Sequence, residues 1–285
     1  MRFDLQDRLD RLAARRPWLA WALRVQRRGG ELHGNTMASA ITLIAFISLF
    51  PLLLLAIAVI GFISSSSSNY AHHAVEQLGL TGSAAQTVTT AISTAQKSRR
   101  VASVIGILGL LWAGLGLAGV LATTYNTVWR VTGRGVKDRL YGLAWLAGMG
   151  VLLAAAFGAA ALVELLPGAL APVGIIVGVS ANTVAFVWTS WILPNRRVAL
   201  RYILPAAVVG GVGFEVLTLV GGLVVPRLVQ RSSELYGTLG VVFGVLAWML
   251  ILGRLIVHVA VIEVLGWESD HGTARESVEH RSEMS

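Results

Sequence analysis

The sequence predicts an all-α integral membrane protein built as a bundle of six transmembrane helices. Of its 285 residues 55% are hydrophobic and 13% are charged, whereas soluble domains average about 45–50% apolar and about 25% charged residues. Six apolar runs are each long enough to cross a hydrocarbon core, which takes about 20 helical residues. The strands of a membrane barrel are only about 10 residues long, so these runs indicate helices.

The spans divide the chain into a leader (1–35), a transmembrane domain (36–265) and a tail (266–285) that we expect to be disordered. The predicted spans cover residues 36–63, 101–129, 140–166, 173–193, 202–225 and 237–265. Alanine and glycine recur in them, as in "WAGLGLAGVLA" and "LLAAAFGAAAL". Such small residues allow helix backbones to approach closely in lipid.

The leader alternates arginines with leucines and Trp18. This pattern predicts an amphipathic interfacial helix whose cations face anionic lipids, at about 1 kcal/mol each. The first thirty residues contain no apolar core of a cleavable signal peptide. Nucleic-acid binding is the competing interpretation, and we disfavour it because the same charges already explain the topology.

The arginines predict the orientation of the bundle. They are concentrated in the leader and in the second and fourth connections, whereas the third connection, "PGALAP", has none. The positive-inside rule therefore places both termini in the cytoplasm. The first connection (64–100) should then lie outside, and the helical spacing of apolar residues from Ala84 to Ala95 predicts a short amphipathic helix in it. This helix either lies on the outer leaflet or caps the bundle, or it is a solvated loop helix with no membrane role.

Three ionisable residues fall inside the last two predicted spans. Counting about 1.5 Å per residue places Glu215 about 20 Å deep and Arg254 about 16 Å deep, so the two could pair. A lone charge in hydrocarbon would cost from about 2.5 to more than 10 kcal/mol. His258 lies one turn beyond Arg254 on the same helix face. A headgroup-binding site and a structural ion pair both remain open. Glu263 should lie near the cytoplasmic interface, where it either snorkels or pairs with a basic loop.

A polar face opens the first span, with Asn35, Ser39 and Thr42 spaced four and three residues apart. We expect this face to look into the bundle. Substrate contact and interhelical hydrogen bonding, worth about 0.6 kcal/mol per bond, are the two alternatives. Further along the span, Pro51 should bend the helix.

Four spaced stretches resemble the YihY/BrkB family of bacterial inner-membrane proteins, its YhjD-like branch in particular. These are "FISLFPLLLLAIAVIGF", "LATTYNTVWRV", "LPNRRVALRYILPAAVVGG" and "LYGTLGVVFGVLAWMLILGRLI", within a similarity from about residue 33 to 267. The positions that match the family pattern are Ser48, Phe50, Pro51, Asn126, Pro194, Asn195, Arg197, Tyr236, Gly237 and Trp248. The resemblance implies a six-span fold in the bacterial inner membrane.

Family members were once labelled ribonuclease BN, and others are linked to envelope integrity and lipid export. The chain has no HExxH, P-loop or GxSxG motif and no cysteine, so we expect neither an enzyme nor a cofactor or metal site. Our first hypothesis is a transporter or flippase of an anionic lipid or lipid-linked envelope precursor, with Arg254 binding phosphate. A non-transporting envelope scaffold is the alternative, and a small-solute or ion channel is weaker. Membrane lipids are the expected partners, and the sequence is compatible with a homo-oligomer.

Overall fold

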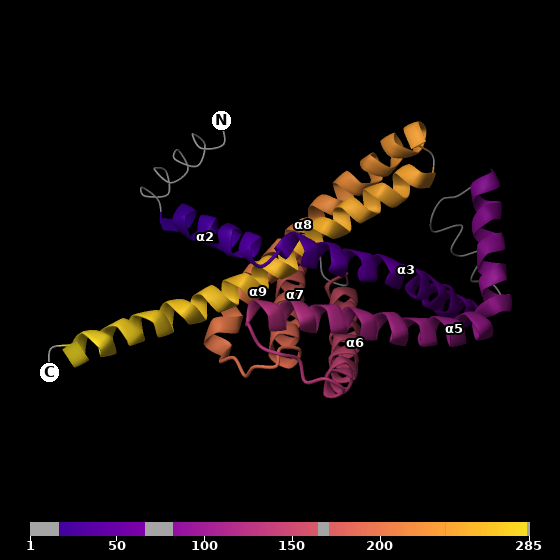
Figure 1. Cartoon of the computed structure of the whole chain (residues 1–285). Coiled ribbons are helices and arrows are strands. Elements are labelled where there is room, and N and C mark those ends of the chain that lie inside the picture. Colours follow the sequence, from indigo (N-terminus) through magenta and orange to yellow (C-terminus); the bar gives the residue numbers. More distant parts are fainter. Residues whose placement is uncertain (1–16, 66–81, 165–170, 237, 284–285) are drawn as a thin grey trace. The chain divides into compact units, whose positions relative to one another are not determined.

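The computed structural model describes residues 17–65, 82–164, 171–236 and 238–283, and every element in these ranges is an α-helix. Figure 1 shows their arrangement along the chain. The helices are α2 (Pro17–Glu31), α3 (Gly34–Ser65), α5 (Gly82–Val128), α6 (Lys137–Glu164), α7 (Ala171–Ile192), α8 (Leu200–Tyr236) and α9 (Thr238–Glu283).

Six of these helices are long and apolar enough to cross a membrane, which confirms the predicted number of spans. The candidate spans are Gly34–Leu55, Ser103–Val128, Lys137–Val163, Pro172–Ile192, Leu200–Gly222 and Val242–His271. Six spans would place both ends of the chain on the same side of a bilayer. The cytoplasmic side remains the prediction that the arginines make.

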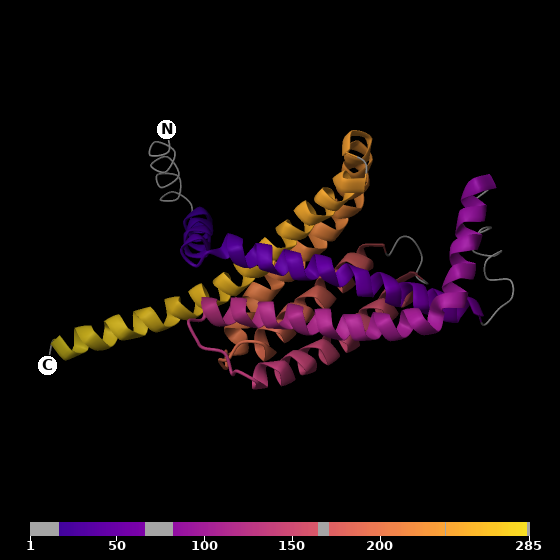
Figure 2. The same ribbon diagram turned by 45° about the vertical axis from the view of Figure 1, so that its right-hand side comes forward.

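The chain divides into two compact units, one made of residues 1–43 and 118–285 and the other of residues 44–117. In the first unit α8 packs against both α7 and α9, α6 packs against α7, and α2 packs against α9. Helices α8 and α9 run side by side in both views (Figures 1 and 2). A buried apolar cluster of Phe186 from α7, Ile203, Ala206 and Ala207 from α8, and Val259 from α9 joins these three helices.

In the second unit, α3 lies against α5 at two glycines. A Cβ atom on Gly109 would lie 2.9 Å from Cβ of Pro51, and one on Gly106 would lie 3.0 Å from the backbone nitrogen of Leu55. The glycines therefore meet α3 at its internal proline and one turn beyond it. The first unit also has a glycine at a close helix contact, because a Cβ on Gly148 of α6 would collide with the indole of Trp188 of α7. These contacts confirm the expectation that small residues bring the helices close together.

Two expected boundaries differ in the structure, those of the loop helix and of the tail. The short helix predicted around residues 84–95 is the first part of α5, and in both views this part turns away from the rest of α5 (Figures 1 and 2). The helix is nevertheless continuous through this turn, because the sequence between Gly82 and Gly106 contains no glycine or proline that would end it. The tail expected to be disordered continues α9 to Glu283. The leader forms α2, with Val25 buried, and the prediction for residues 1–16 lies outside the described residues.

Helix α5 ends in a left-handed cap at Arg130, whose φ is 52°. The Val131 N–H donates to the carbonyl of Asn126 (2.9 Å) and the Arg130 N–H donates to that of Thr127 (3.1 Å). These two bonds form a Schellman motif, in which glycine usually takes the position of Arg130.

Because glycine adopts positive φ without a Cβ clash, Arg130→Gly is expected to raise the free energy of unfolding by about 1 kcal/mol. Detergent-induced unfolding followed by tryptophan fluorescence would measure it. Arg130→Ala is the matched control, because it removes the same charge and keeps the Cβ. An equal gain in the free energy of unfolding in both variants would show that the lost charge is the cause, and it would contradict the explanation from the Cβ at positive φ.

Candidate functional site

Three of the predicted site residues line one small pocket between α2, α3 and α9. Its volume is about 40 Å³, and Asn35, Arg254 and His258 line it together with Gln26. His258 Nδ1 donates to the carbonyl oxygen of Arg254 (2.6 Å), and His258 Nε2 lies 3.2 Å from Gln26 Oε1. The expected proximity of Arg254 and His258 is confirmed, and Asn35 lies beside them.

Glu215 does not join this group, so the expected pairing of Glu215 with Arg254 is wrong. The Glu215 carboxylate accepts a hydrogen bond from Asn182 Nδ2 of α7 (3.0 Å), and the described residues contain no ion pair between Glu215 and Arg254. Helices α8 and α9 meet where Gly213 faces Leu255. Glu215 follows Gly213 by two residues, so its side chain leaves α8 at about 200° around the helix axis from Gly213. Glu215 therefore points toward α7 and not toward α9.

The polar face of α3 is only partly directed inward. Thr42 is buried, and its hydroxyl donates to the carbonyl of Ala38 (2.7 Å) and lies 3.3 Å from the carbonyl of Met249. Ser39 is exposed, and its hydroxyl donates to the Asn35 carbonyl (3.0 Å). The expectation of an inward face therefore holds for Thr42, whereas Ser39 lies on the outside of this unit.

Three family-motif residues meet at the end of α7. The Asn195 N–H donates to Asn126 Oδ1 of α5 (2.7 Å), and Asn195 Nδ2 donates to the carbonyl of Thr132 (2.8 Å). Pro194 is buried, and its carbonyl accepts a hydrogen bond from the guanidinium of Arg134. These bonds fix the connection after α7 against the end of α5.

Three other motif positions lie in the second unit. The Ser48 side chain is buried and donates to the Ile44 carbonyl (2.8 Å), whereas Phe50 is 63% exposed. Pro51 lies inside α3. The proline removes the N–H that would donate to the carbonyl of Ile47, whereas the Ser48 hydroxyl bonds the carbonyl of Ile44, about two turns before the proline.

The last four motif positions fall near α7, α8 and α9. Arg197 is exposed, and Trp248 of α9 packs over Gly221 of α8. Tyr236 is the last residue of α8. The prediction for Gly237 lies outside the described residues.

The structure reveals a buried polar cluster that the sequence reasoning missed. Glu263 is fully buried, so its expected place beside a basic loop is wrong. The hydroxyl oxygen of Ser190 on α7 lies 2.5 Å from Glu263 Oε1 and 3.1 Å from the hydroxyl of Tyr125, which is itself fully buried. The signal that could have found it is a lone carboxylate among branched apolar residues, "VAVIEV".

An aromatic layer adjoins this cluster. The Arg196 guanidinium lies 4.1 Å from the ring centroid of Trp267 and 4.9 Å from that of Trp129. Trp129 and Trp267 follow Tyr125 and Glu263 by four residues each, which is about 6 Å along the helices. The cation therefore lies one turn from the buried cluster.

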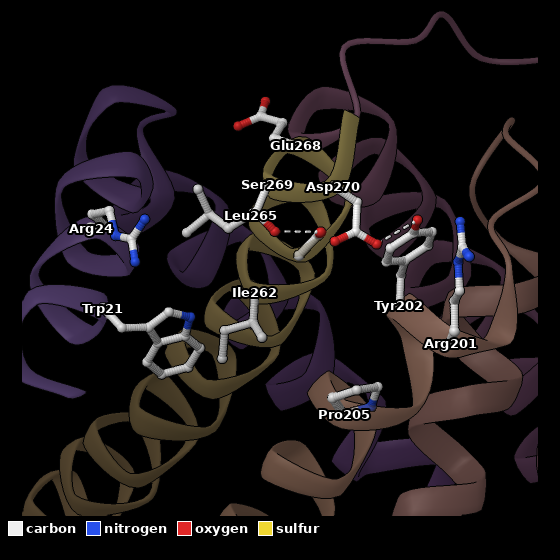
Figure 3. A pocket seen from close by; sticks show the side chains of 11 residues that line it. Trp21, Arg24, Arg201, Tyr202, Pro205, Ile262, Leu265, Glu268, Ser269 and Asp270 are labelled. Carbon is white, nitrogen blue, oxygen red and sulfur yellow. Dashed lines mark hydrogen bonds between the residues drawn. The ribbon is translucent and has the colours of Figure 1, made fainter. Parts of the chain in front are cut away.

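A cavity of about 620 Å³ opens between α2, the start of α8 and the later part of α9 (Figure 3). Arg24 of α2 and Arg201 of α8 lie at opposite sides of it, with Ile262 and Leu265 of α9 between them (Figure 3). The remaining lining residues are Trp21, Tyr202, Pro205, Gly266, Glu268, Ser269 and Asp270. The cavity thus combines apolar walls with charged groups.

The carboxylates of this cavity already have partners. Asp270 accepts a hydrogen bond from the Tyr202 hydroxyl (3.0 Å), and Glu268 pairs with Arg28 (2.9 Å). Neither Arg24 nor Arg201 forms an ion pair within the described part of the chain. Arg201 instead lies over the ring of Tyr202, 4.6 Å from its centroid. Two guanidinium groups therefore remain available to an anion.

Six spans packed through glycine contacts define a multi-pass α-helical membrane protein. Residues 25–282 match the family described as Virulence factor BrkB. The chain belongs to this family, which confirms the YihY/BrkB resemblance, and the YhjD-like branch stays a prediction. No curated protein and no solved structure is significantly similar to the chain.

Proposed function

We propose that the protein moves an anionic lipid or lipid-linked envelope precursor across the bacterial inner membrane. The observation that supports this most is the cavity with Arg24 and Arg201 on opposite sides, where no carboxylate of a described residue pairs with either arginine. Arginine matches phosphate oxygens with two parallel hydrogen bonds. The apolar side chains of Trp21, Ile262 and Leu265 suit the first carbons of an acyl or prenyl chain.

The small pocket at Arg254 supports a path for the lipid headgroup along α2 and α9. The cavity and the small pocket are both lined by these two helices, the first at Arg24 and Leu265 and the second at Gln26 and Arg254. Leu265 and Arg254 are eleven residues apart on α9, or about 16 Å. A phosphate that leaves the cavity would next meet Arg254, so the sequence-based assignment of Arg254 to headgroup binding remains part of the proposal.

The alternative is an envelope scaffold that transports nothing. Helix α9 favours it in one respect, because it continues past the last span to Glu283 and its sequence there is rich in charged residues. In the transport proposal this extension has no assigned role. The channel hypothesis gains no support from either pocket.

The double variant Arg24→Gln, Arg201→Gln tests the proposal. Purified protein in liposomes would be assayed for binding and transbilayer movement of a labelled phosphatidylglycerol. Loss of both phosphate partners is expected to weaken binding at least tenfold, which is about 1.4 kcal/mol, and to slow movement in proportion.

Arg197→Gln is the matched control, because Arg197 is exposed and outside the cavity lining. It should bind and move the lipid as the unmodified protein does. Equal binding and movement in the double variant would reject the cavity as the lipid site. Absence of movement in the unmodified protein would favour the scaffold.

A further inference from the structure

Glu263 is a buried ionisable residue to which the proposed lipid path assigns no role. It lies on α9 between cavity-lining residues, because Ile262 precedes it and Leu265 and Gly266 follow it. Its own side chain points away from the cavity, toward Ser190 of α7. One helix therefore presents a lipid cavity on one face and a buried carboxyl group on another.

The hydrogen bonds around Glu263 suit a neutral acid better than an anion. Its Oε1 meets Ser190, and its Oε2 is buried with no hydrogen-bond partner among the described residues. A carboxylate would leave a charged oxygen without a donor, which is the most costly way to bury a polar group. In a neutral carboxyl group the oxygen without a partner carries no charge, and the acid O–H can donate to Ser190, whose hydroxyl can then donate to Tyr125.

Among the described residues, no charged side chain forms an ion pair with Glu263 that would compensate an anion. Tyr125 of α5 is the titratable side chain that reaches the cluster, and α7 supplies Ser190. From α8, the hydroxyl of Tyr202 donates elsewhere, to Asp270. The residues one turn away on α9 are Val259, Ala260, Gly266 and Trp267. Arg196, the cation of the adjoining aromatic layer, lies against the rings of Trp129 and Trp267.

We infer that Glu263 is a proton-binding site that couples the packing of α9 to lipid movement. In the conformation described, Glu263 holds its proton and the cavity is open. When α9 shifts and water reaches the carboxyl, the proton leaves to water and a carboxylate remains. The anion cannot return to this dry position, so α9 stays displaced until the carboxyl is protonated again. The coupling to lipid movement rests on the proposed function, whereas proton binding does not.

Infrared spectroscopy tests proton binding without any transport assay. In membranes at neutral pH, the C=O stretching band of a protonated carboxylic acid should be present and should shift when glutamate is labelled with ¹³C. Glu263→Gln should remove the band, Ser190→Ala should shift it, and Glu268→Gln should leave it unchanged. Absence of a labelled acid band in the unmodified protein would overturn the inference even if the variants fail to fold.

The pH dependence of lipid movement tests the coupling. Movement of labelled phosphatidylglycerol should change at least tenfold across the titration of Glu263 and should lose this dependence in Glu263→Gln, while lipid binding in the cavity persists. An unchanged pH dependence in Glu263→Gln would overturn the coupling. A dependence on Na⁺ in place of H⁺ would identify a sodium site and overturn it as well. An acid band in a protein that moves no lipid would reject the proposed function and leave the proton site in place.

Discussion

Replacing Gly211 by alanine is expected to lower the free energy of unfolding by about 1–3 kcal/mol, the usual cost of overpacking. A Cβ at this position of α8 would collide with the Thr183 side chain of α7. It would also lie 2.8 Å from the Thr183 backbone nitrogen and 2.9 Å from the carbonyl oxygen of Val179. A side chain can rotate away from such a contact, but backbone atoms cannot. The two helices would have to separate.

The matched control is Gly222→Ala on the same helix, where a Cβ would meet nothing within 4 Å. Alanine favours a helix over glycine by about 1 kcal/mol, so this variant should be as stable as the unmodified protein or slightly more stable. Unfolding in SDS, followed through the fluorescence of the nine tryptophans, would compare the two. A loss of the same size in Gly222→Ala would show that backbone contact between α7 and α8 is not the cause.

This comparison also shows what the sequence could predict of the fold. Runs of apolar residues were sufficient to predict the six spans, because a segment of that length in lipid can form all its backbone hydrogen bonds only as a helix. The glycine pattern predicted close packing, but not its partners. Gly211 and Gly222 are alike in sequence, and only the three-dimensional contacts show that one faces Thr183 and the other faces open space. The rotation of each helix about its own axis decides this, and hydropathy does not report it.

The candidate site illustrates the same limit. Arg254 and His258 are four residues apart on one helix, so their proximity could be predicted. Pairing Glu215 with Arg254 rested on equal depth alone, and the rotation of α8 instead directs Glu215 to Asn182. The cavity residues Arg24 and Arg201 lie 177 positions apart in the chain. No local pattern could bring them together, and it is the packing of α2 and α8 around α9 that does so.

Asn126→Ala is expected to destabilise the protein by about 1–3 kcal/mol, because it removes the acceptor of the Asn195 N–H. The Asn126 side chain is buried, and the bond is 2.7 Å long. Thr127→Ala is the matched control, since that hydroxyl is exposed and donates within its own helix to the Thr123 carbonyl (2.8 Å). The control should stay within about 0.5 kcal/mol of the unmodified protein.

Loss of this hydrogen bond in Asn126→Ala should also change the packing of the aromatic layer, because Arg196 follows Asn195 directly and lies against both Trp129 and Trp267. Once the N–H of Asn195 is free, the connection after α7 can move and take the guanidinium with it. Tryptophan emission of the folded variant should therefore shift toward that of solvated indole, and Thr127→Ala should show no shift. If the variant is destabilised but its emission is unchanged, Asn126 stabilises only the hydrogen bond to the Asn195 N–H. The position of Arg196 against the two tryptophans would then not depend on Asn126.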